Sequence, residues 1–150
     1  MNDLGYLRQP TIAGDAIVFV CDDDLWRVDA DGGLARRLTA GVGEPSTPML
    51  SPGGTWLAYV SRDEQHPEVW LMPGEGGPAR RMTWLGANFL AVLGFTPEGR
   101  ILFSTPYGQP HFRYFRAWTL DRNGGLPERL PLGQVNHLSF GPRIGPHGAR

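Results

Sequence analysis

The sequence predicts an all-β chain, a partial β-propeller of about three four-stranded blades followed by the first strand of a fourth. The tryptophans Trp26, Trp70 and Trp118 recur at intervals of 44 and 48 residues. A glycine pair follows each tryptophan, at residues 32–33, 76–77 and 124–125. Short apolar runs and Pro-Gly or Gly-Gly turns fill each interval, and no segment has a convincing amphipathic helical pattern. Four short strands in about 44 residues is the length of a propeller blade.

The composition narrows the possible function classes. The 150 residues include 21 Gly and 14 Pro, and 41% are apolar, which favours a turn-rich folded chain over a disordered one. The net charge of −1 disfavours a general nucleic-acid or anionic-membrane surface, and no apolar run reaches the ~20 residues of a membrane span. The segment Met1–Gly5 lacks the pattern of a secretory signal, so none is expected. The lone Cys21 excludes an internal disulfide and favours a reducing, cytoplasmic location.

The expected elements follow the repeat in order. In the second repeat, the strands are expected at about Pro45–Leu50, Trp56–Ser61, Glu68–Met72 and Ala79–Thr83. The apolar stretch Ala87–Leu93 contains Val92 and adjoins two glycines, so a strand is favoured over a helix there. The expected units are blade 1 at about 6–39, blade 2 at about 45–83, blade 3 at about 88–132, the start of blade 4 at about 135–140, and an irregular tail at 141–150.

The repeats differ in length at one connection only. The distance from the apolar run to the tryptophan grows from one repeat to the next, whereas the spacing after the tryptophan is constant. The extra residues fall in the hairpin loops Asp22–Asp24, Arg62–Pro67 and Tyr107–Arg113. Insertions that collect in one connection indicate a surface loop on a fixed scaffold.

The repeat count predicts an incomplete ring. A closed propeller has at least four blades, and fewer leave strand edges unpaired. We therefore expect a fragment of a larger propeller, or a chain that pairs with another, with marginal stability and association through its open edges. The alternative is a compact sandwich of about thirteen strands that happens to be repetitive.

The search for chemistry in the sequence is mostly negative. There is no Gly-x-Ser-x-Gly nucleophile elbow, and Asp22–Asp24 lacks the ligand spacing of a calcium loop, so it is interpreted as an acidic hairpin turn. No two histidines have metal-ligand spacing, although two of them lie in the variable hairpin loops. The four histidines are His66, His111, His137 and His147. We predict no catalytic, cofactor-binding or metal-binding residue in this chain, and no cofactor.

The remaining distinctive residues have structural interpretations. The recurring pairs Arg36-Arg37 and Arg80-Arg81 are typical of an outer strand whose charges block unwanted pairing, rather than of an anion-binding rim. The segment Arg113–Arg116 alternates cations and aromatics, and a twisted edge strand is favoured over a nucleic-acid surface. Cys21 is interpreted as a structural residue in a strand. Each recurring tryptophan is expected to fill the same gap between neighbouring blades.

Several motifs resemble a known family. Tyr6-Leu7-Arg8-Gln9-Pro10 and the segment Val18–Trp26, with its Asp-Asp-Leu-Trp motif, resemble the start of tricorn proteases and their bacterial homologues. Further segments resemble the first propeller of the same family over about Tyr6 to Gly141. They are Ser51-Pro52-Gly53-Gly54, Arg81-Met82-Thr83-Trp84, Gly94-Phe95-Thr96-Pro97-Glu98-Gly99 and Glu128-Arg129-Leu130-Pro131.

The resemblance implies a role in peptide degradation. Tricorn is a large cytoplasmic serine protease with a six-bladed propeller, a seven-bladed propeller, a PDZ domain and catalytic core domains. Its propellers are thought to gate peptide entry and product exit, and its catalytic residues lie far beyond residue 150. In the archaeal enzyme an arginine pair after the second blade anchors a peptide terminus, but the matching stretch here, Gly86–Leu90, has no arginine.

The expected partners follow from this resemblance. They are peptides passing through the propeller opening, the remaining domains of the parent protease, and further copies of the parent in a homo-oligomer, with no nucleic acid and no membrane. The chain alone is expected to be inactive. Two alternatives remain open: a non-enzymatic TolB-like interaction propeller, and the propeller of a prolyl-oligopeptidase-like α/β-hydrolase peptidase.

Overall fold

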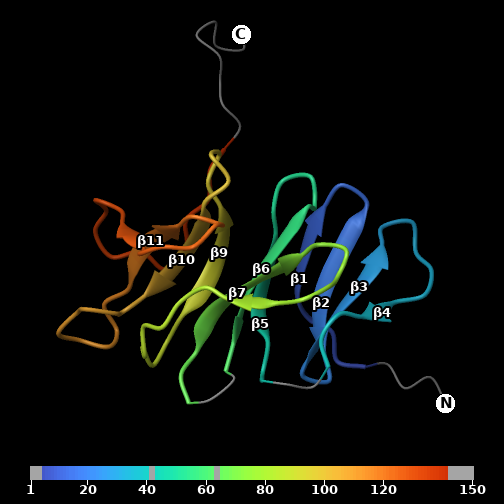
Figure 1. Ribbon diagram of the computed structural model, residues 1–150, viewed down its shortest axis with the longest axis horizontal. Coiled ribbons are helices and arrows are strands. Elements are labelled where there is room, and N and C mark those ends of the chain that lie inside the picture. The colour runs from blue at the N-terminus through green and yellow to red at the C-terminus, as the bar shows by residue number, and fades with distance from the viewer. Residues whose placement is uncertain (1–4, 41–42, 63–64, 142–150) are drawn as a thin grey trace, which may run out of the picture.

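The computed structural model describes residues 5–40, 43–62 and 65–141 (Figure 1). These residues contain twelve strands and no helix, in three four-stranded antiparallel sheets. Blade 1 comprises β1 (Arg8–Ala13), β2 (Ala16–Cys21), β3 (Asp24–Asp29) and β4 (Arg36–Arg37). Blade 2 comprises β5 (Ser46–Leu50), β6 (Trp56–Ser61), β7 (Glu68–Pro73) and β8 (Arg80–Arg81). Blade 3 comprises β9 (Ala91–Phe95), β10 (Ile101–Thr105), β11 (Arg116–Leu120) and β12 (Glu128–Arg129).

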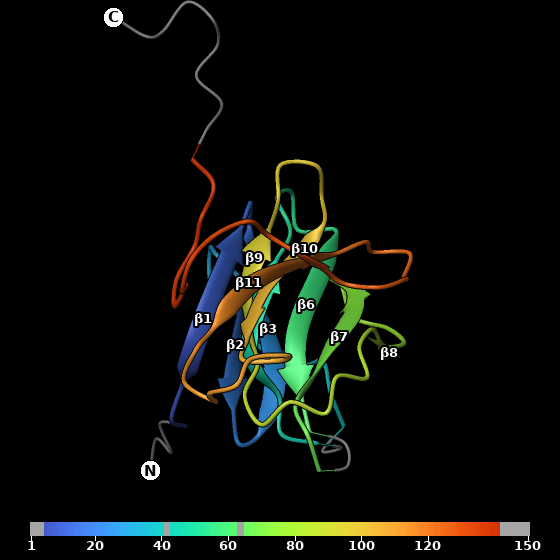
Figure 2. The ribbon, with the colours of Figure 1, turned by 90° about the vertical axis from the view of Figure 1, so that its left-hand side faces the viewer.

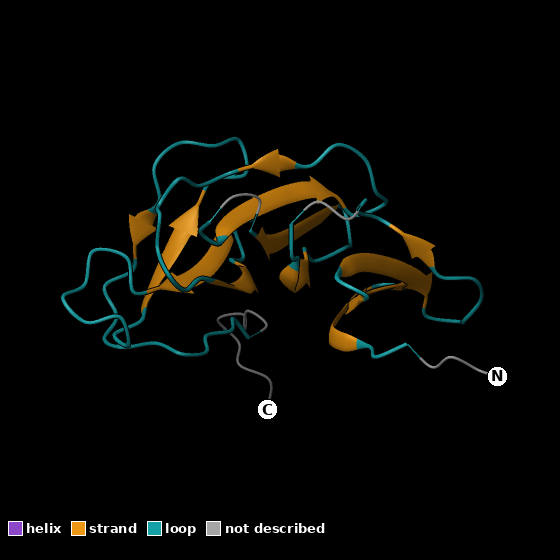
Figure 3. Ribbon diagram, turned by 90° about the horizontal axis from the view of Figure 1, so that it is seen from below, coloured by secondary structure: helices purple, strands orange, loops and turns teal. Residues whose placement is uncertain are grey.

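The sheets are arranged as part of a ring. Each sheet has its strands in chain order, so every connection within a blade is an antiparallel hairpin. The three sheets form an arc with the two-residue strands β4, β8 and β12 on its convex side (Figure 3). The first strands contact one another, β1 against β5 and β5 against β9. The partial propeller predicted from the sequence is confirmed, and the alternative of a compact sandwich is wrong.

The core consists of two layers between the sheets. The faces of blades 1 and 2 bury a cluster that includes Val18, Leu25, Leu57 and Met72. The opposite face of blade 2 and the facing side of blade 3 bury a second cluster, which includes Val60 and Phe103. Because β6 is buried on both faces, its sequence is apolar at successive positions and period-2 alternation is weak.

The recurring tryptophans have the predicted packing role. Trp70 packs against the cluster between blades 1 and 2, and Trp118 packs against the cluster between blades 2 and 3. Trp26 holds the equivalent place on blade 1, where no preceding blade is present among the described residues. Its indole Nε1 donates to the Cys21 carbonyl at 3.1 Å, whereas Nε1 of Trp70 and of Trp118 is buried with no partner in the described chain.

Polar side chains also join neighbouring blades along the inner strands. The Thr47 N–H donates to Gln9 Oε1 at 2.7 Å, and the Val92 N–H donates to Thr47 Oγ1 at 3.0 Å. Each inner strand therefore satisfies an edge N–H of the next one, a group that would otherwise be left open.

A second set of contacts joins the outer parts of the blades. Glu75, in the β7–β8 turn of blade 2, accepts from Arg27 at 2.8 Å and from Arg36 at 3.0 Å, both on blade 1. One repeat later, Arg80 of blade 2 donates to the Arg122 carbonyl of blade 3. The blades are thus held together at the inner strands, through the apolar layers and at the outer turns.

Three details differ from the sequence-based expectations. Val135–Phe140, expected as the first strand of a fourth blade, forms no strand, because the described chain supplies no neighbouring strand to pair with it. The strand expected from Ala87 begins only at Ala91, and residues 87–90 belong to a loop. Arg116 begins β11, which lies between β10 and β12, so the expected edge strand at 113–116 is wrong. Most of the expected tail, 142–150, lies outside the described residues.

Candidate functional site: a loop platform on blades 2 and 3

Two loops lie side by side at one end of the arc. They are residues 84–90, which connect blades 2 and 3, and residues 106–115, which join β10 to β11; together we call them the loop platform. Both loops lie along the lower edge of Figure 1, and Figure 2 looks toward them from the side of blade 3. The loop 106–115 is the longest of the three β-hairpin loops whose length varies between repeats.

A buried carboxylate holds the first loop in place. Glu68 is 2% exposed, and its Oε2 accepts from Thr83 Oγ1 at 2.5 Å and from the Leu85 N–H at 3.0 Å. Its Oε1 accepts from the Gly86 N–H at 2.9 Å and lies 3.5 Å from Arg81 Nη2. A buried carboxylate with this many donors is fully compensated, so it can fix the start of the loop.

The same arrangement recurs in blade 1 and is reversed in blade 3. In blade 1, Thr39 Oγ1 donates to Asp24 Oδ1 at 2.5 Å, and Arg37 forms an ion pair with the same carboxylate. In blade 3 the position of the acid is held by Arg116, whose Nη1 donates to the Leu132 carbonyl at 2.5 Å. In every blade the segment that follows the outermost strand is therefore tied to the start of the third strand. The tying side chain is a carboxylate in blades 1 and 2 and an arginine in blade 3.

The carboxylate–threonine contact is not among the features predicted from the sequence. Its signal was present, since an Arg-x-Thr segment follows the first two tryptophans at the same distance and an acidic residue precedes each tryptophan by two positions. The sequence predicts a single acidic turn at Asp22–Asp24. The structure separates them: Asp22 and Asp23 form the two-residue turn with φ of 48° and 58°, and Asp24 is buried.

The two platform loops are tied to each other. Thr105 Oγ1 donates to the Phe89 carbonyl at 2.8 Å. The Phe89 ring lies 6.4 Å from the Phe112 ring and 6.3 Å from the Phe115 ring, measured between centroids. At these separations aromatic rings attract each other, so Phe89 is positioned by both backbone and side-chain contacts.

Cations lie over exposed rings across the same surface. The Arg113 guanidinium is 5.4 Å from the Phe112 centroid, and that of Arg116 is 4.7 Å from the Tyr114 centroid. At the edge of the platform, Arg81 is 5.3 Å from the Trp84 centroid. These distances are within the range of cation–π attraction, which restrains the arginines without neutralising their charge.

Two hollows border the platform. One, of about 360 Å³, lies between the loops and is lined by residues that include Asn88, Tyr107 and Phe112. The other, of about 530 Å³, is lined by residues that include His66, Arg81 and Trp84. Together they place both aromatic and cationic groups around open space.

The other residues singled out from the sequence lie elsewhere or apart. His66, in the β6–β7 loop of blade 2, lines the second hollow, and His111 lies in the loop 106–115 of blade 3. His137 is exposed, and His147 lies outside the described residues. Within the described ranges no group of three or more histidine, cysteine or acidic side chains could hold a metal.

The arginine pairs and the cysteine have the expected positions. Arg36-Arg37 form β4 and Arg80-Arg81 form β8, the outermost strands of their sheets. Cys21 is buried at the end of β2, and burial together with the neighbouring Asp22 charge raises the pKa of its thiol. An unreactive, structural thiol fits this environment.

Comparison with known proteins decides the family. Residues 4–145 match the family of tricorn protease N-terminal β-propeller domains. The chain belongs to this family. The chain is also 39% identical over 137 residues to tricorn protease homolog 1 of Streptomyces coelicolor, a match that covers 91% of this chain and 13% of that relative. This chain therefore spans only a small part of the length of such a relative.

Solved structures agree with this assignment. The crystal structure of the tricorn protease matches this chain with a TM-score of 0.83 at 28% identity, and the match covers 91% of this chain and 14% of the tricorn protease chain. TolB from Acinetobacter baumannii matches with a TM-score of 0.72 at 19% identity, which shows a shared propeller fold alone. No helix in the described part of the chain is long and apolar enough to cross a membrane.

Proposed function

We propose that this chain is part of the N-terminal propeller of a tricorn-like serine protease and that its role is structural and gating. The ring screens peptides by size during peptide access or product exit, in cytoplasmic peptide degradation. This segment supplies no catalytic group, and the remaining domains of the parent protease carry out hydrolysis in a homo-oligomer. The blade limits proposed for it are 6–39, 45–83 and 88–132.

The family match over 4–145 is the observation that carries this proposal. The way the blades are joined supports it. A gate that excludes by size must not widen under thermal motion, and here neighbouring blades share apolar layers as well as inner and outer polar contacts. Close-packed layers resist deformation, so an opening held by them keeps its dimensions.

The test uses the protein in its full natural length. Hydrolysis rates are measured for a thin linear peptide and for a bulky cyclic peptide that contains the same scissile bond. We expect the linear peptide to be strongly preferred. The double variant Trp70→Phe, Trp118→Phe loosens both blade interfaces, and we expect it to raise the relative rate of the bulky peptide several-fold while the linear peptide is unaffected.

A matched control keeps the result interpretable. Tyr6 is 78% exposed and lies outside the apolar layers between the blades, so Tyr6→Phe should leave the ratio of the two rates unchanged. Equal rates for the two peptides in the natural protein, or a ratio that the double variant does not alter, would contradict gating by this propeller.

A further inference from the structure

The loop platform exposes an unusual concentration of aromatic surface. Most of the exposed aromatic side chains of the described chain lie on its two loops, at exposed fractions between 37% and 71%. They are Trp84, Phe89, Tyr107, Phe112 and Tyr114. Exposed apolar groups gathered in one place indicate a surface that another molecule covers.

The platform is also organised before anything binds. Phe89 is held by Thr105 and by two neighbouring rings, and the loop start is held by Glu68. Within the second loop the Tyr114 N–H donates to the His111 carbonyl at 3.0 Å. Rings that are already ordered lose little conformational entropy on binding, which is a property of good recognition surfaces.

The platform loops themselves carry only positive charge. Residues 84–90 and 106–115 contain no aspartate or glutamate and one arginine, Arg113, and Arg116 follows the second loop directly. Glu68, which holds the start of the loop 84–90, is buried, and its carboxylate oxygens are used by these contacts. Arg113 makes no ion pair within the described part of the chain and is restrained only over Phe112. Its charge is therefore available to an anionic partner.

Arg116 adds a fixed cation beside the same loop. Its Nη1 donates to the Leu132 carbonyl and its guanidinium lies over Tyr114, yet its buried Nε has no acceptor among the described residues. An unpaired buried donor is costly, and a nearby carboxylate would lower that cost by its field even without direct contact.

The hollow between the loops has room for an apolar side chain. Its volume of about 360 Å³ falls within the usual range of small-molecule pockets, roughly 300–1,000 Å³. Tyr107 and Phe112 line it, and Arg113 follows Phe112 directly in the chain. An apolar group in the hollow and an anion beside it would both find a partner.

We propose that the loop platform binds peptide segments in which a side-chain carboxylate neighbours an aromatic or large aliphatic side chain. This proposal rests on the proposed function only in that peptides reach this end of the propeller. Exclusion by size does not depend on the side chains of the peptide, whereas the platform would prefer peptides of this composition. The recognised anion is an Asp or Glu side chain.

Direct binding tests the proposal in the full-length protein. Two synthetic octapeptides with acetylated and amidated ends, one with two Asp residues flanking Phe and one with Asn in place of each Asp, are compared by isothermal titration calorimetry. We expect the Asp peptide to bind about tenfold more tightly at low salt and to lose this advantage at high salt, because the recognition is electrostatic. Since no hydrolysis is measured, failure of gating and failure of this proposal are distinguishable.

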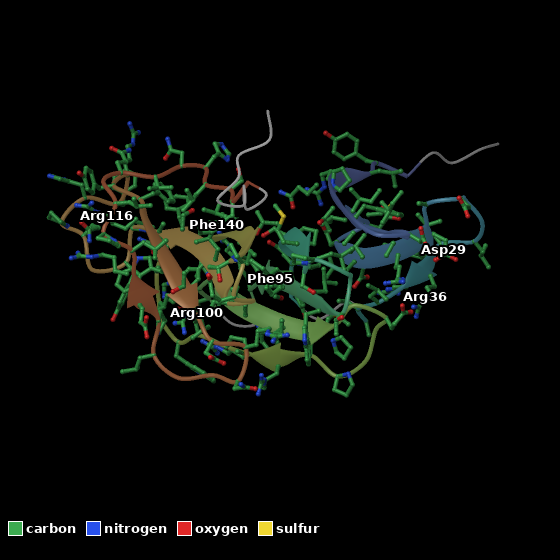
Figure 4. The ribbon with its side chains drawn as sticks, turned by 90° about the horizontal axis from the view of Figure 1, so that it is seen from above. Asp29, Arg36, Phe95, Arg100, Arg116 and Phe140 are labelled. Carbon is green, nitrogen blue, oxygen red and sulfur yellow. The ribbon has the colours of Figure 1, made fainter. Side chains whose placement is uncertain are left out.

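Variants locate the site. We expect Arg113→Gln and Phe112→Ala each to weaken binding of the Asp peptide several-fold, with unchanged circular dichroism. Arg36→Gln is the matched control, because Arg36 is an exposed arginine at the opposite end of the arc from Arg116 (Figure 4) and should have no effect. Phe89→Ala is the variant on the loop 84–90, and we expect it also to weaken binding of the Asp peptide several-fold if the site comprises both loops.

Three outcomes would overturn the proposal. They are equal affinity for the Asp and Asn peptides, binding that requires a free C-terminal carboxylate in place of the amide, and binding that Arg113→Gln leaves unaltered. A single-stranded oligonucleotide is a further probe, since aromatic rings with arginines also suit nucleic acids. Preference for that oligonucleotide over the Asp peptide would likewise contradict a peptide site.

Discussion

Thr83 donates its hydroxyl proton to the Glu68 carboxylate, with 2.5 Å between Oγ1 and Oε2, and the same hydroxyl oxygen accepts the Val69 N–H at 2.9 Å. Both residues are almost fully buried. The Thr83 side chain thus joins the segment after β8 to the start of β7. Glu68 in turn holds the loop that leads to blade 3. The platform depends on this contact, although neither residue belongs to it.

Replacing Thr83 by valine should therefore destabilise the chain. Thr83→Val keeps the shape but leaves a buried N–H unpaired and removes one donor to a buried carboxylate, so we expect a loss of about 2 kcal/mol. Urea titration of the 150-residue chain measures it. Thr55→Val is the control, because Thr55 is exposed in a turn and should change stability by less than about 0.5 kcal/mol. Equal effects of the two substitutions would argue against the contact.

The tryptophans between blades predict a larger effect. Trp70→Ala removes a large ring that packs against the layer between blades 1 and 2, so we expect a loss of about 3 kcal/mol. Trp84→Ala, at an exposed position, should cost less than about 1 kcal/mol. Both are measured by denaturant titration followed by circular dichroism, and a loss below about 1 kcal/mol for Trp70→Ala would contradict the packing role.

The turn of the first β-hairpin predicts a stabilising substitution. Asp22 and Asp23 both have positive φ, which glycine adopts without a steric penalty, so Asp23→Gly should raise stability by about 0.5 kcal/mol. The Arg8–Asp23 ion pair that it removes is exposed and contributes little. Asp23→Ala is the control, because it removes the same ion pair and keeps the strained backbone. Differential scanning calorimetry should rank Asp23→Gly above Asp23→Ala.

Cys21 predicts a dependence of stability on alkaline pH. Burial raises the pKa of its thiol above the ordinary value of 9.0. Below pH 9.0 both the folded and the unfolded chain hold the proton, so the thiol has no effect. As the pH rises above 9.0, the unfolded chain releases the proton first, and stability falls.

A variant without the thiol isolates its contribution. All 14 basic residues are arginine, so no lysine titrates in the same range, and the four tyrosines are common to both chains that are compared. Cys21→Ala should show a shallower loss of stability between pH 9 and 10.5 than the natural chain. The thiol should also react with iodoacetamide far more slowly in the folded chain than in urea. Identical pH profiles, or fast alkylation in the folded state, would exclude a buried thiol.

Much of the fold could be predicted from local signals. The strand limits of blade 2 are close to the expected ones: β6 covers Trp56–Ser61 as predicted, and β7 starts at Glu68. Turns made by Pro-Gly and Gly-Gly pairs mark these limits because few residues adopt their backbone conformations. Prediction from local sequence failed at Val135–Phe140, because this apolar, β-prone segment has no strand to pair with among the described residues.

The candidate site was only partly visible in the sequence. The alternating cations and rings of Arg113–Arg116 predict an edge strand, not a loop of the platform. Phe89 was seen only within an apolar stretch. Their proximity depends on how blades 2 and 3 pack, and loops from different blades have no spacing rule that relates them. Likewise, Glu68 looked like an ordinary charged residue until its burial and four partners were known.

The recurring tryptophans, glycine pairs and turns by themselves determine that this chain makes three successive four-stranded sheets, because strand, turn and repeat length are properties of neighbouring residues. Only the tertiary structure decides which faces meet, that a carboxylate lies under the loop 84–90, and that Phe89 and Phe112 come together beside Arg113. Those relationships join residues from separate strands and loops, and they exist only once the apolar layers have brought the sheets together.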